Sequence, residues 1–254
     1  MGHEFETADS VEVDATPEQV WQAIATGPGI DSWFMGRNEV DHDAATGRGV
    51  VRQSFGDYEP EHRVTAWEPM RRFAYRTEDA PDGGFVAYEF LVEGRDRGAT
   101  VLRMATSGFL PGDDWEAEYD AMTTGNALFF ATLATYLRHF AGRTAVPVTV
   151  FGPPITDWDR TRATLLAALG LSGTPKPGDR VRVEPAGLEP IDGEVYFVNA
   201  DTLGVRTPDA LYRFIRGFAG PIVAAHHLFG QAGPGGDVPA VEHAWQSWLT
   251  TTFA

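Results

Sequence analysis

The chain has 254 residues, of which 43% are hydrophobic and 12% aromatic, enough for two domains of about 100–150 residues with well-packed cores. The formal net charge is −16 and there is no cysteine, so we expect no nucleic-acid partner, no disulfide and no thiolate metal site. The chain starts without a basic and apolar leader, and no apolar run reaches the roughly 20 residues of a membrane span. These features predict a cytoplasmic protein without membrane insertion.

The first half of the sequence predicts one strand, two short helices and then a run of strands. Alternation between Phe5 and Ala15 is typical of a half-exposed strand. Thr16 and Pro17 begin the first short helix, and a second short helix is expected to carry Ile30, Trp33 and Phe34. The later strands are expected at Val50–Phe55, His62–Trp67, Arg72–Thr77, Phe85–Val92 and Thr100–Thr106.

A long amphipathic helix is expected from about Asp114 to Phe140. Its apolar residues recur every three or four positions, which is the spacing of one helix face. Asn126 is the one polar residue on this face, and a buried amide must find hydrogen-bond partners.

The second half repeats the order of elements in a shorter form. The segment Phe73–Thr77 parallels Leu203–Thr207, and each half ends with an aromatic-rich helix. We therefore expect two copies of one fold, residues 1–143 and 144–254, the second degenerate and with little or no cavity. The alternative is one such domain followed by an unrelated α+β domain. The strands of the second half are expected at Val146–Phe151, Arg180–Glu184, Glu194–Asn199, Leu203–Thr207, Ala210–Phe218 and Pro221–Phe229.

Three segments carry a resemblance to a known superfamily: Val11–Trp21, Ile30–Phe34 and Val64–Phe73. Together with the order of elements, they resemble the START-like, helix-grip fold of the SRPBCC superfamily. Within it they are similar to the family named for the activator of the 90-kDa heat-shock-protein ATPase, over roughly residues 5–141. The resemblance implies an α+β fold in which a curved antiparallel sheet wraps a long C-terminal helix, with a cavity between them and no cofactor.

Candidate ligand-binding residues follow from this fold. Aromatic rings on the second short helix could stack on a ring-bearing ligand, and Asn126 could meet a ligand hydroxyl or carbonyl group. Tyr75 and Arg76 must point to opposite faces of their strand, and an inward arginine would anchor an anionic or carbonyl ligand. For each residue, a purely structural role is the competing interpretation. The complete set is Trp33, Phe34, Tyr75, Arg76, Tyr88, Arg103, Trp115, Tyr119, Met122 and Asn126.

Neither a metal site nor a catalytic motif is predicted. The adjacent His226 and His227 point to opposite faces of a strand, so they are poorly placed to share a metal ion. The leading hypothesis is therefore non-catalytic binding of a small hydrophobic or aromatic molecule in the N-terminal cavity. One alternative is a polyketide cyclase or hydrolase, which would require an inward carboxylate or histidine with a shifted pKa. Another is a chaperone cofactor or interaction module that binds a protein partner through an exposed apolar patch.

Overall fold

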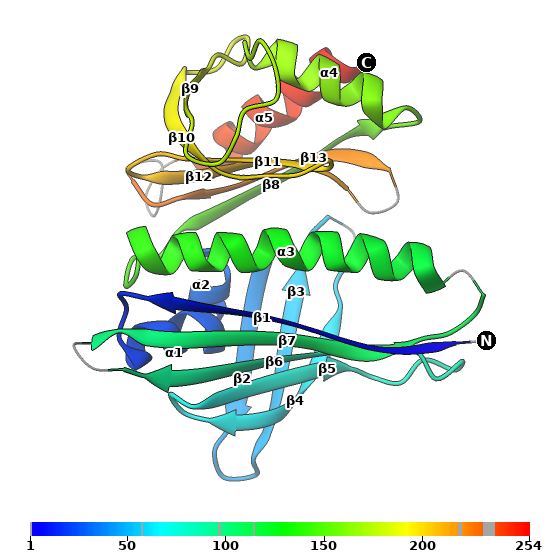
Figure 1. Cartoon of the computed structure of the whole chain (residues 1–254), viewed down its shortest axis with the longest axis vertical. Helices are drawn as coiled ribbons and strands as arrows, with labels where there is room; N and C mark the ends of the chain where they lie inside the picture. The colour runs from blue at the N-terminus through cyan, green and yellow to red at the C-terminus, as the bar shows by residue number, and fades with distance from the viewer. Residues whose placement is uncertain (1, 57, 96–97, 114, 218–219, 231–236) are drawn as a thin grey trace. The chain divides into compact units, whose positions relative to one another are not determined.

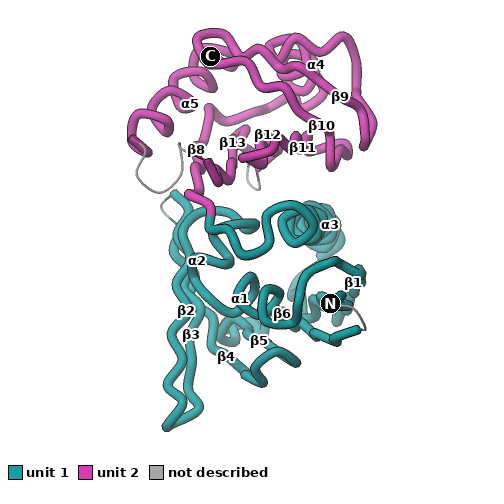
Figure 2. Tube along the Cα trace, turned by 90° about the vertical axis from the view of Figure 1, so that its left-hand side faces the viewer, with its two compact units in different colours: residues 1–144 teal, residues 145–254 magenta. Residues whose placement is uncertain are grey.

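The structure is a computed structural model that describes residues 2–254 except 57, 96–97, 114, 218–219 and 231–236. The chain divides into two compact units, Met1–Thr144 and Ala145–Ala254, coloured separately in Figure 2. Each unit is an antiparallel sheet with a long helix at its C-terminal end (Figure 1). The two-copy helix-grip fold expected from the sequence is thereby confirmed.

Unit 1 is built on a seven-stranded sheet in the order β1-β7-β6-β5-β4-β3-β2. Its first strand, β1, pairs with its last, β7. From β7 the sheet continues through β6, β5, β4 and β3 to β2, so each of these strands pairs with its neighbour in sequence. The long helix α3 packs over β1 and β7. The elements of unit 1 are β1 (His3–Val13), α1 (Pro17–Ala25), α2 (Gly27–Ile30), β2 (Arg37–Asp43), β3 (Arg48–Ser54), β4 (Glu61–Glu68), β5 (Arg72–Thr77), β6 (Phe85–Gly94), β7 (Thr100–Leu110) and α3 (Trp115–His139).

The first helix begins where the sequence predicted. The Thr16 hydroxyl accepts a hydrogen bond from the Gln19 backbone N–H, and the Gln19 side chain accepts one from the Thr16 N–H. This reciprocal capping box satisfies two amides that the helix itself leaves unpaired.

Two expectations for unit 1 need correction. The second helix is Gly27–Ile30, because the Thr26 side chain caps it; Trp33 and Phe34 therefore lie in the turn after it. The strand β2 was missed, because its sequence is mostly charged, as is common for a strand at the edge of a sheet. Asp114, the expected start of the long helix, lies outside the described residues.

Unit 2 repeats the arrangement with six strands, in the order β8-β13-β12-β11-β10-β9. Again the first strand pairs with the last, and α5 packs on β8 and β13. Phe218, the expected end of one strand, lies outside the described residues. The elements are β8 (Val146–Pro154), α4 (Trp158–Ala168), β9 (Arg180–Val183), β10 (Ile191–Val198), β11 (Thr202–Arg206), β12 (Ala210–Arg216), β13 (Pro221–Leu228) and α5 (Val238–Phe253).

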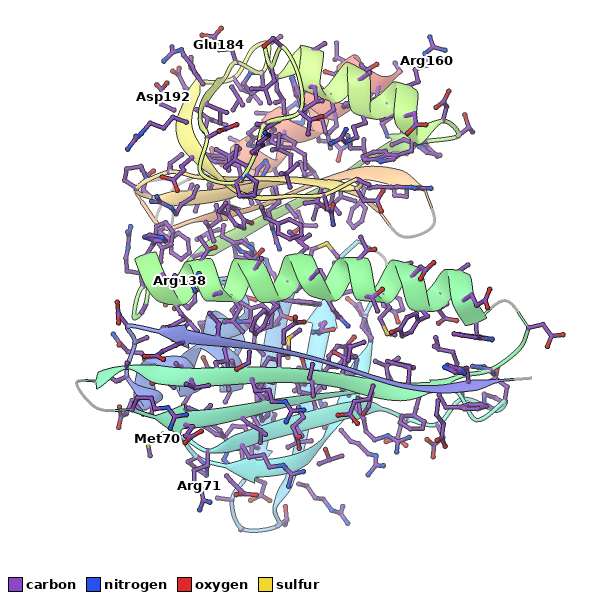
Figure 3. The ribbon with its side chains drawn as sticks, in the orientation of Figure 1. Met70, Arg71, Arg138, Arg160, Glu184 and Asp192 are labelled. Atoms are coloured by element: carbon purple, nitrogen blue, oxygen red, sulfur yellow. The ribbon has the colours of Figure 1, made fainter. Side chains whose placement is uncertain are left out.

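The turn between β4 and β5 lies away from the helix-covered side of the unit 1 sheet. Met70 and Arg71 project outward there (Figure 3), and Met70 has a φ of 60°. Met70 is 40% exposed, so this apolar side chain does not contribute to the core.

Candidate ligand-binding site

A cavity lies inside unit 1, between the sheet and α3. Strand alternation builds its floor, because residues two apart point to the same face. Tyr75 on β5 pairs with Tyr88 on β6, and Phe90 pairs with Met104 on β7. The residues that line the cavity are Trp33, Phe34, Gln53, Tyr75, Tyr88, Phe90, Met104, Asn126 and Phe129.

The roof comes from α3 and from the turn after α2. Asn126 and Phe129 are three residues apart on α3, so they lie on the same helix face. Phe34 reaches across from the turn, and its ring lies 4.3 Å from that of Phe129 at an angle of 45°. The two phenyl rings therefore join the turn to the helix along one side of the cavity.

The cavity is narrower than the sequence led us to expect. Its free volume is about 10 Å³, close to the minimum that one water molecule needs. The reason is the size of the lining side chains, since Trp33 and Phe90 are almost completely buried and their rings lie 6.1 Å apart. A ligand larger than water must therefore displace part of the lining.

Asn126 is the polar group of the roof. Its side chain is 8% exposed, and its Nδ2 atom is buried without a hydrogen-bond partner in the protein. An amide hydrogen left unpaired in an apolar setting costs about 1–3 kcal/mol. The Oγ1 atom of Thr106, the cross-strand partner of Tyr88, is buried and unpartnered as well.

His62 on β4 lies beside the two floor tyrosines. Its ring centroid is 5.5 Å from that of Tyr75 and 6.3 Å from that of Tyr88. Burial lowers the pKa of His62, against the smaller effect of a hydrogen bond with the Val51 backbone, so the imidazole is neutral at physiological pH. Its Nδ1 atom is buried and has no partner.

Burial also keeps both tyrosine hydroxyls protonated. It raises the pKa of Tyr88 to about 12, and it raises the pKa of Tyr75 further, with the neighbouring Tyr88 adding to the effect. Both phenols are therefore neutral hydrogen-bonding groups, and the described part of the floor carries no formal charge near them.

Two arginines expected as candidates do not line the cavity. Arg76 follows Tyr75 directly and points to the other face, where it pairs with Asp79 and lies 4.0 Å from the centre of the Phe85 ring. Arg103 is half exposed and lies 3.9 Å from a carboxylate oxygen of Glu6. Strand alternation is the reason in both cases.

Three further candidates lie near the N-terminal end of α3. Trp115 stacks on His3 with ring centroids 3.9 Å apart, and Tyr119 meets Phe5 edge to face at 5.8 Å. Met122 is half buried and is not among the lining residues. The two aromatic pairs fasten α3 to β1.

Sequence reasoning missed the lining residues Gln53, Phe90, Met104 and Phe129. It also missed His62, which lies beside Tyr75 and Tyr88. Two signals were available: Phe90 lies two residues after Tyr88 on the same strand, and Phe129 lies one helical turn after Asn126. Gln53 and Met104 could not be placed without knowing the register of the strands.

The described residues contain no group of three His, Cys, Asp or Glu side chains placed to hold a metal ion. Within the same part of the chain, no helix combines the length and apolar character needed to cross a membrane.

The sequence of unit 1 is similar to a known protein family. A family model described as "Polyketide cyclase / dehydrase and lipid transport" matches residues 4–143. No curated protein matches the chain.

Solved structures are similar at low identity. The di-domain ARO/CYC BexL from the BE-7585A biosynthetic pathway is 18% identical, with 97% of this chain and 94% of that chain covered and a TM-score of 0.46. DynU16 from the dynemicin biosynthetic locus is 20% identical, with 97% and 95% covered and a TM-score of 0.42. The Aha1 dimer from Colwellia psychrerythraea is 20% identical, with 53% and 96% covered and a TM-score of 0.41. Because the family model covers more than half of its residues, the chain belongs to the polyketide cyclase/dehydrase and lipid-transport family.

Proposed function

We propose that unit 1 binds, without catalysis, a small aromatic molecule that carries a hydrogen-bond acceptor, in the cavity between its sheet and α3. The observation that carries the proposal is the Nδ2 atom of Asn126, buried without a partner among aromatic lining residues. A ligand carbonyl or ether oxygen would accept a hydrogen bond from Asn126 Nδ2. This bond would offset the cost of burying the amide away from water.

The lining suits a flat ring system. Aromatic pairs prefer offset or edge-to-face contacts with centroids about 4.5–7 Å apart, and the ring of Tyr75 already lies 5.3 Å from that of Tyr88 and 6.3 Å from that of Phe90. An inserted ring would replace these contacts with equivalent ones. Because Tyr75, Tyr88 and His62 are all neutral, the site is compatible with an uncharged ligand.

Entry requires the cavity to open. The contact between Phe34 and Phe129 is the place we assign for this, because both side chains are only partly buried while Trp33 is held inside the core. Burial of the ligand's apolar surface, at about 25 cal/mol per Å², offsets the cost of separating the two phenyl rings.

The test uses two probes of one shape, 1-tetralone and tetralin, which differ in one carbonyl oxygen. We expect the protein to bind 1-tetralone about 5–10-fold more tightly, the size of one hydrogen bond to a buried amide. Asn126→Leu should remove this preference while still binding both probes. Isothermal titration calorimetry and native mass spectrometry give the affinities and the stoichiometry.

The matched control is Asn38→Leu, which replaces a second buried asparagine of unit 1 that does not line the cavity. It should keep the preference for 1-tetralone. Failure of both probes to bind the wild-type protein, or an undiminished preference in Asn126→Leu, contradicts the proposal.

A second candidate function is acid–base catalysis on a polyketide-like substrate, and His62 is the observation that favours it. His62 is not itself a lining residue, but its neutral imidazole has an unpartnered Nδ1 atom beside two lining tyrosines. A substrate that displaces part of the lining would therefore meet a general base next to hydrogen-bond donors. Its simplest reaction would be removal of a proton from the carbon next to a ketone, with the enolate oxygen held by a donor.

Hydrogen–deuterium exchange separates binding from catalysis. In D₂O, catalysis by His62 would speed the loss of the C2 protons of 1-tetralone, followed by proton NMR, and His62→Gln would abolish the acceleration. Exchange at the buffer rate in the wild-type protein supports binding without catalysis.

No observation favours the third hypothesis, a docking protein. The large apolar side chains that are exposed in the described part of the chain are Tyr58, 62% exposed, and Met70, 40% exposed. Tyr58 lies between β3 and β4, and Met70 between β4 and β5.

A further inference from the structure

The two sheets carry corresponding residues beneath their long helices. In unit 1 a row of inward residues runs across β5, β6 and β7, where Tyr75 pairs with Tyr88 and Tyr88 with Thr106. In unit 2 the equivalent strands are β11, β12 and β13, because each sheet has the same strand order counted from its first and last strands. There Val205 pairs with Tyr212, and the next residue across the sheet is His226.

The position of His226 follows from the register and from ring contacts. It lies between the registered pairs Leu211↔His227 and Phe214↔Ala224, and its ring centroid is 5.0 Å from that of Tyr212. His226 and Thr106 therefore occupy corresponding places, and each has a buried polar atom without a partner.

The hydrogen bonds of His226 define where its proton lies. The Nδ1 atom accepts a hydrogen bond of 3.2 Å from the backbone N–H of Arg213, so a neutral imidazole carries its hydrogen on Nε2. The side chain is 0% exposed, and burial lowers its pKa, which holds it in the neutral form. The Nε2–H group is thus a donor without an acceptor inside the core of unit 2.

Trp245 on α5 lies against the His226 ring. Its ring centroid lies 4.3 Å from that of His226 at an angle of 67°, and 5.8 Å from that of Phe214. Trp245 is 5% exposed and belongs to the unit 2 core. An aromatic face is a weak acceptor for an N–H group, so the indole only partly replaces a true acceptor.

We propose that the indole of Trp245 is a built-in occupant of the unit 2 counterpart of the ligand site, and that its removal uncovers a site for a flat bicyclic aromatic molecule with a ring-nitrogen acceptor. The ring nitrogen accepts a hydrogen bond from His226 Nε2–H, and the ring fills the space of the indole. In the wild-type protein this site is occupied by the protein's own side chain, so it takes no ligand there. The proposal concerns unit 2 and stands whether or not unit 1 binds a ligand.

The test is binding of quinoline and of naphthalene, which share one shape but differ in one ring nitrogen. Trp245→Ala should bind quinoline about 5–10-fold more tightly than naphthalene in unit 2, and quinoline should restore part of the lost thermal midpoint. The double variant Trp245→Ala with His226→Phe should bind both probes equally.

Trp248→Ala is the matched control, because Trp248 lies on the same helix in the same core, 5.6 Å from Trp245. Its cavity should show no preference for quinoline. Equal affinities in Trp245→Ala, or the same preference in Trp248→Ala, would overturn the proposal.

A measurement on the wild-type protein covers the case in which Trp245→Ala does not fold. Nitrogen-15 NMR of the imidazoles should show His226 as the Nε2–H tautomer, with its hydrogen shielded by the indole ring current and slow to exchange with water. An Nδ1–H tautomer, or an unshielded and rapidly exchanging hydrogen, would overturn the proposal without any variant.

Discussion

The indole Nε1 atom of Trp33 donates a hydrogen bond of 2.9 Å to the carbonyl oxygen of Ala23 on α1. Trp33 is 2% exposed, so this bond fixes one wall of the cavity to the first helix. Phe34, the next residue, is held less deeply and faces Phe129. The two neighbouring aromatics thus differ: Trp33 is a buried, hydrogen-bonded wall of the cavity, and Phe34 is partly buried beside Phe129.

The fixed wall gives the first prediction. Trp33→Phe keeps an aromatic ring but deletes the donor, so the free energy of unfolding of unit 1 should fall by at least about 1–2 kcal/mol. Urea unfolding measures the change. A loss no larger than that of Trp115→Phe, which alters a partly exposed stack on His3, would show that the bond contributes little.

The contact between Phe34 and Phe129 gives the second prediction. Phe34→Ala removes one half of the contact that closes the cavity, so a fluorescent aromatic probe should associate several-fold faster in stopped-flow mixing. Phe55→Ala, which changes a partly buried phenylalanine outside the lining, should leave the rate unchanged. An unaltered rate in Phe34→Ala would place the entrance elsewhere.

The third prediction concerns the outward arginines. Arg76→Gln and Arg103→Gln should each leave the affinity for 1-tetralone within about twofold, because their guanidinium groups pair with carboxylates on the other face of the sheet. An exposed ion pair such as Arg103–Glu6 contributes at most about 1 kcal/mol to stability. A tenfold loss of affinity in either variant would mean that the arginine reaches the ligand.

Acid stability gives the fourth prediction. Burial lowers the pKa of His226 to about 3, well below the value of about 6.5 in an unfolded chain. The unfolded state therefore binds the proton first as pH falls. Stability is complete above about pH 6.5 and declines toward pH 3, by up to about 1.4 kcal/mol per pH unit for this one group.

His226→Asn checks this linkage, because asparagine keeps an acceptor near the position of Nδ1 and does not titrate. Its free energy of unfolding should change less between pH 7 and pH 5 than that of the wild-type protein. His243→Gln, which changes an exposed histidine on α5, should behave as the wild type does. Equal pH dependence in all three proteins would contradict a buried, neutral His226.

Local patterns were sufficient to predict most of the fold. The Thr16 cap, the strand alternation and the seam of the long helix each depend on residues near one another in sequence. The edge strand β2 was missed, since no apolar face marks it. Gly27–Ile30 forms a separate helix because the Thr26 side chain caps a new turn immediately after α1.

The candidate site was less predictable because it depends on the register between strands. Alternation showed that Tyr75 and Arg76 differ in direction but not which of them faces inward. In the structure Tyr75 lines the cavity, whereas Arg76 pairs with Asp79 on the other face. The position of His62 beside Tyr75 and Tyr88 depends in the same way on how the strands pair. The free volume depends on how the aromatic side chains pack against one another, which no local pattern determines.

The side-chain amide of Asn126 tests the central claim most directly. In a nitrogen-15 spectrum, the Asn126 signal is identified by its loss in Asn126→Leu. On addition of 1-tetralone to the wild-type protein, this signal should move in the direction of a stronger hydrogen bond and show nuclear Overhauser contacts to the ligand ring. Binding of 1-tetralone that leaves the Asn126 amide signal unchanged would contradict the account.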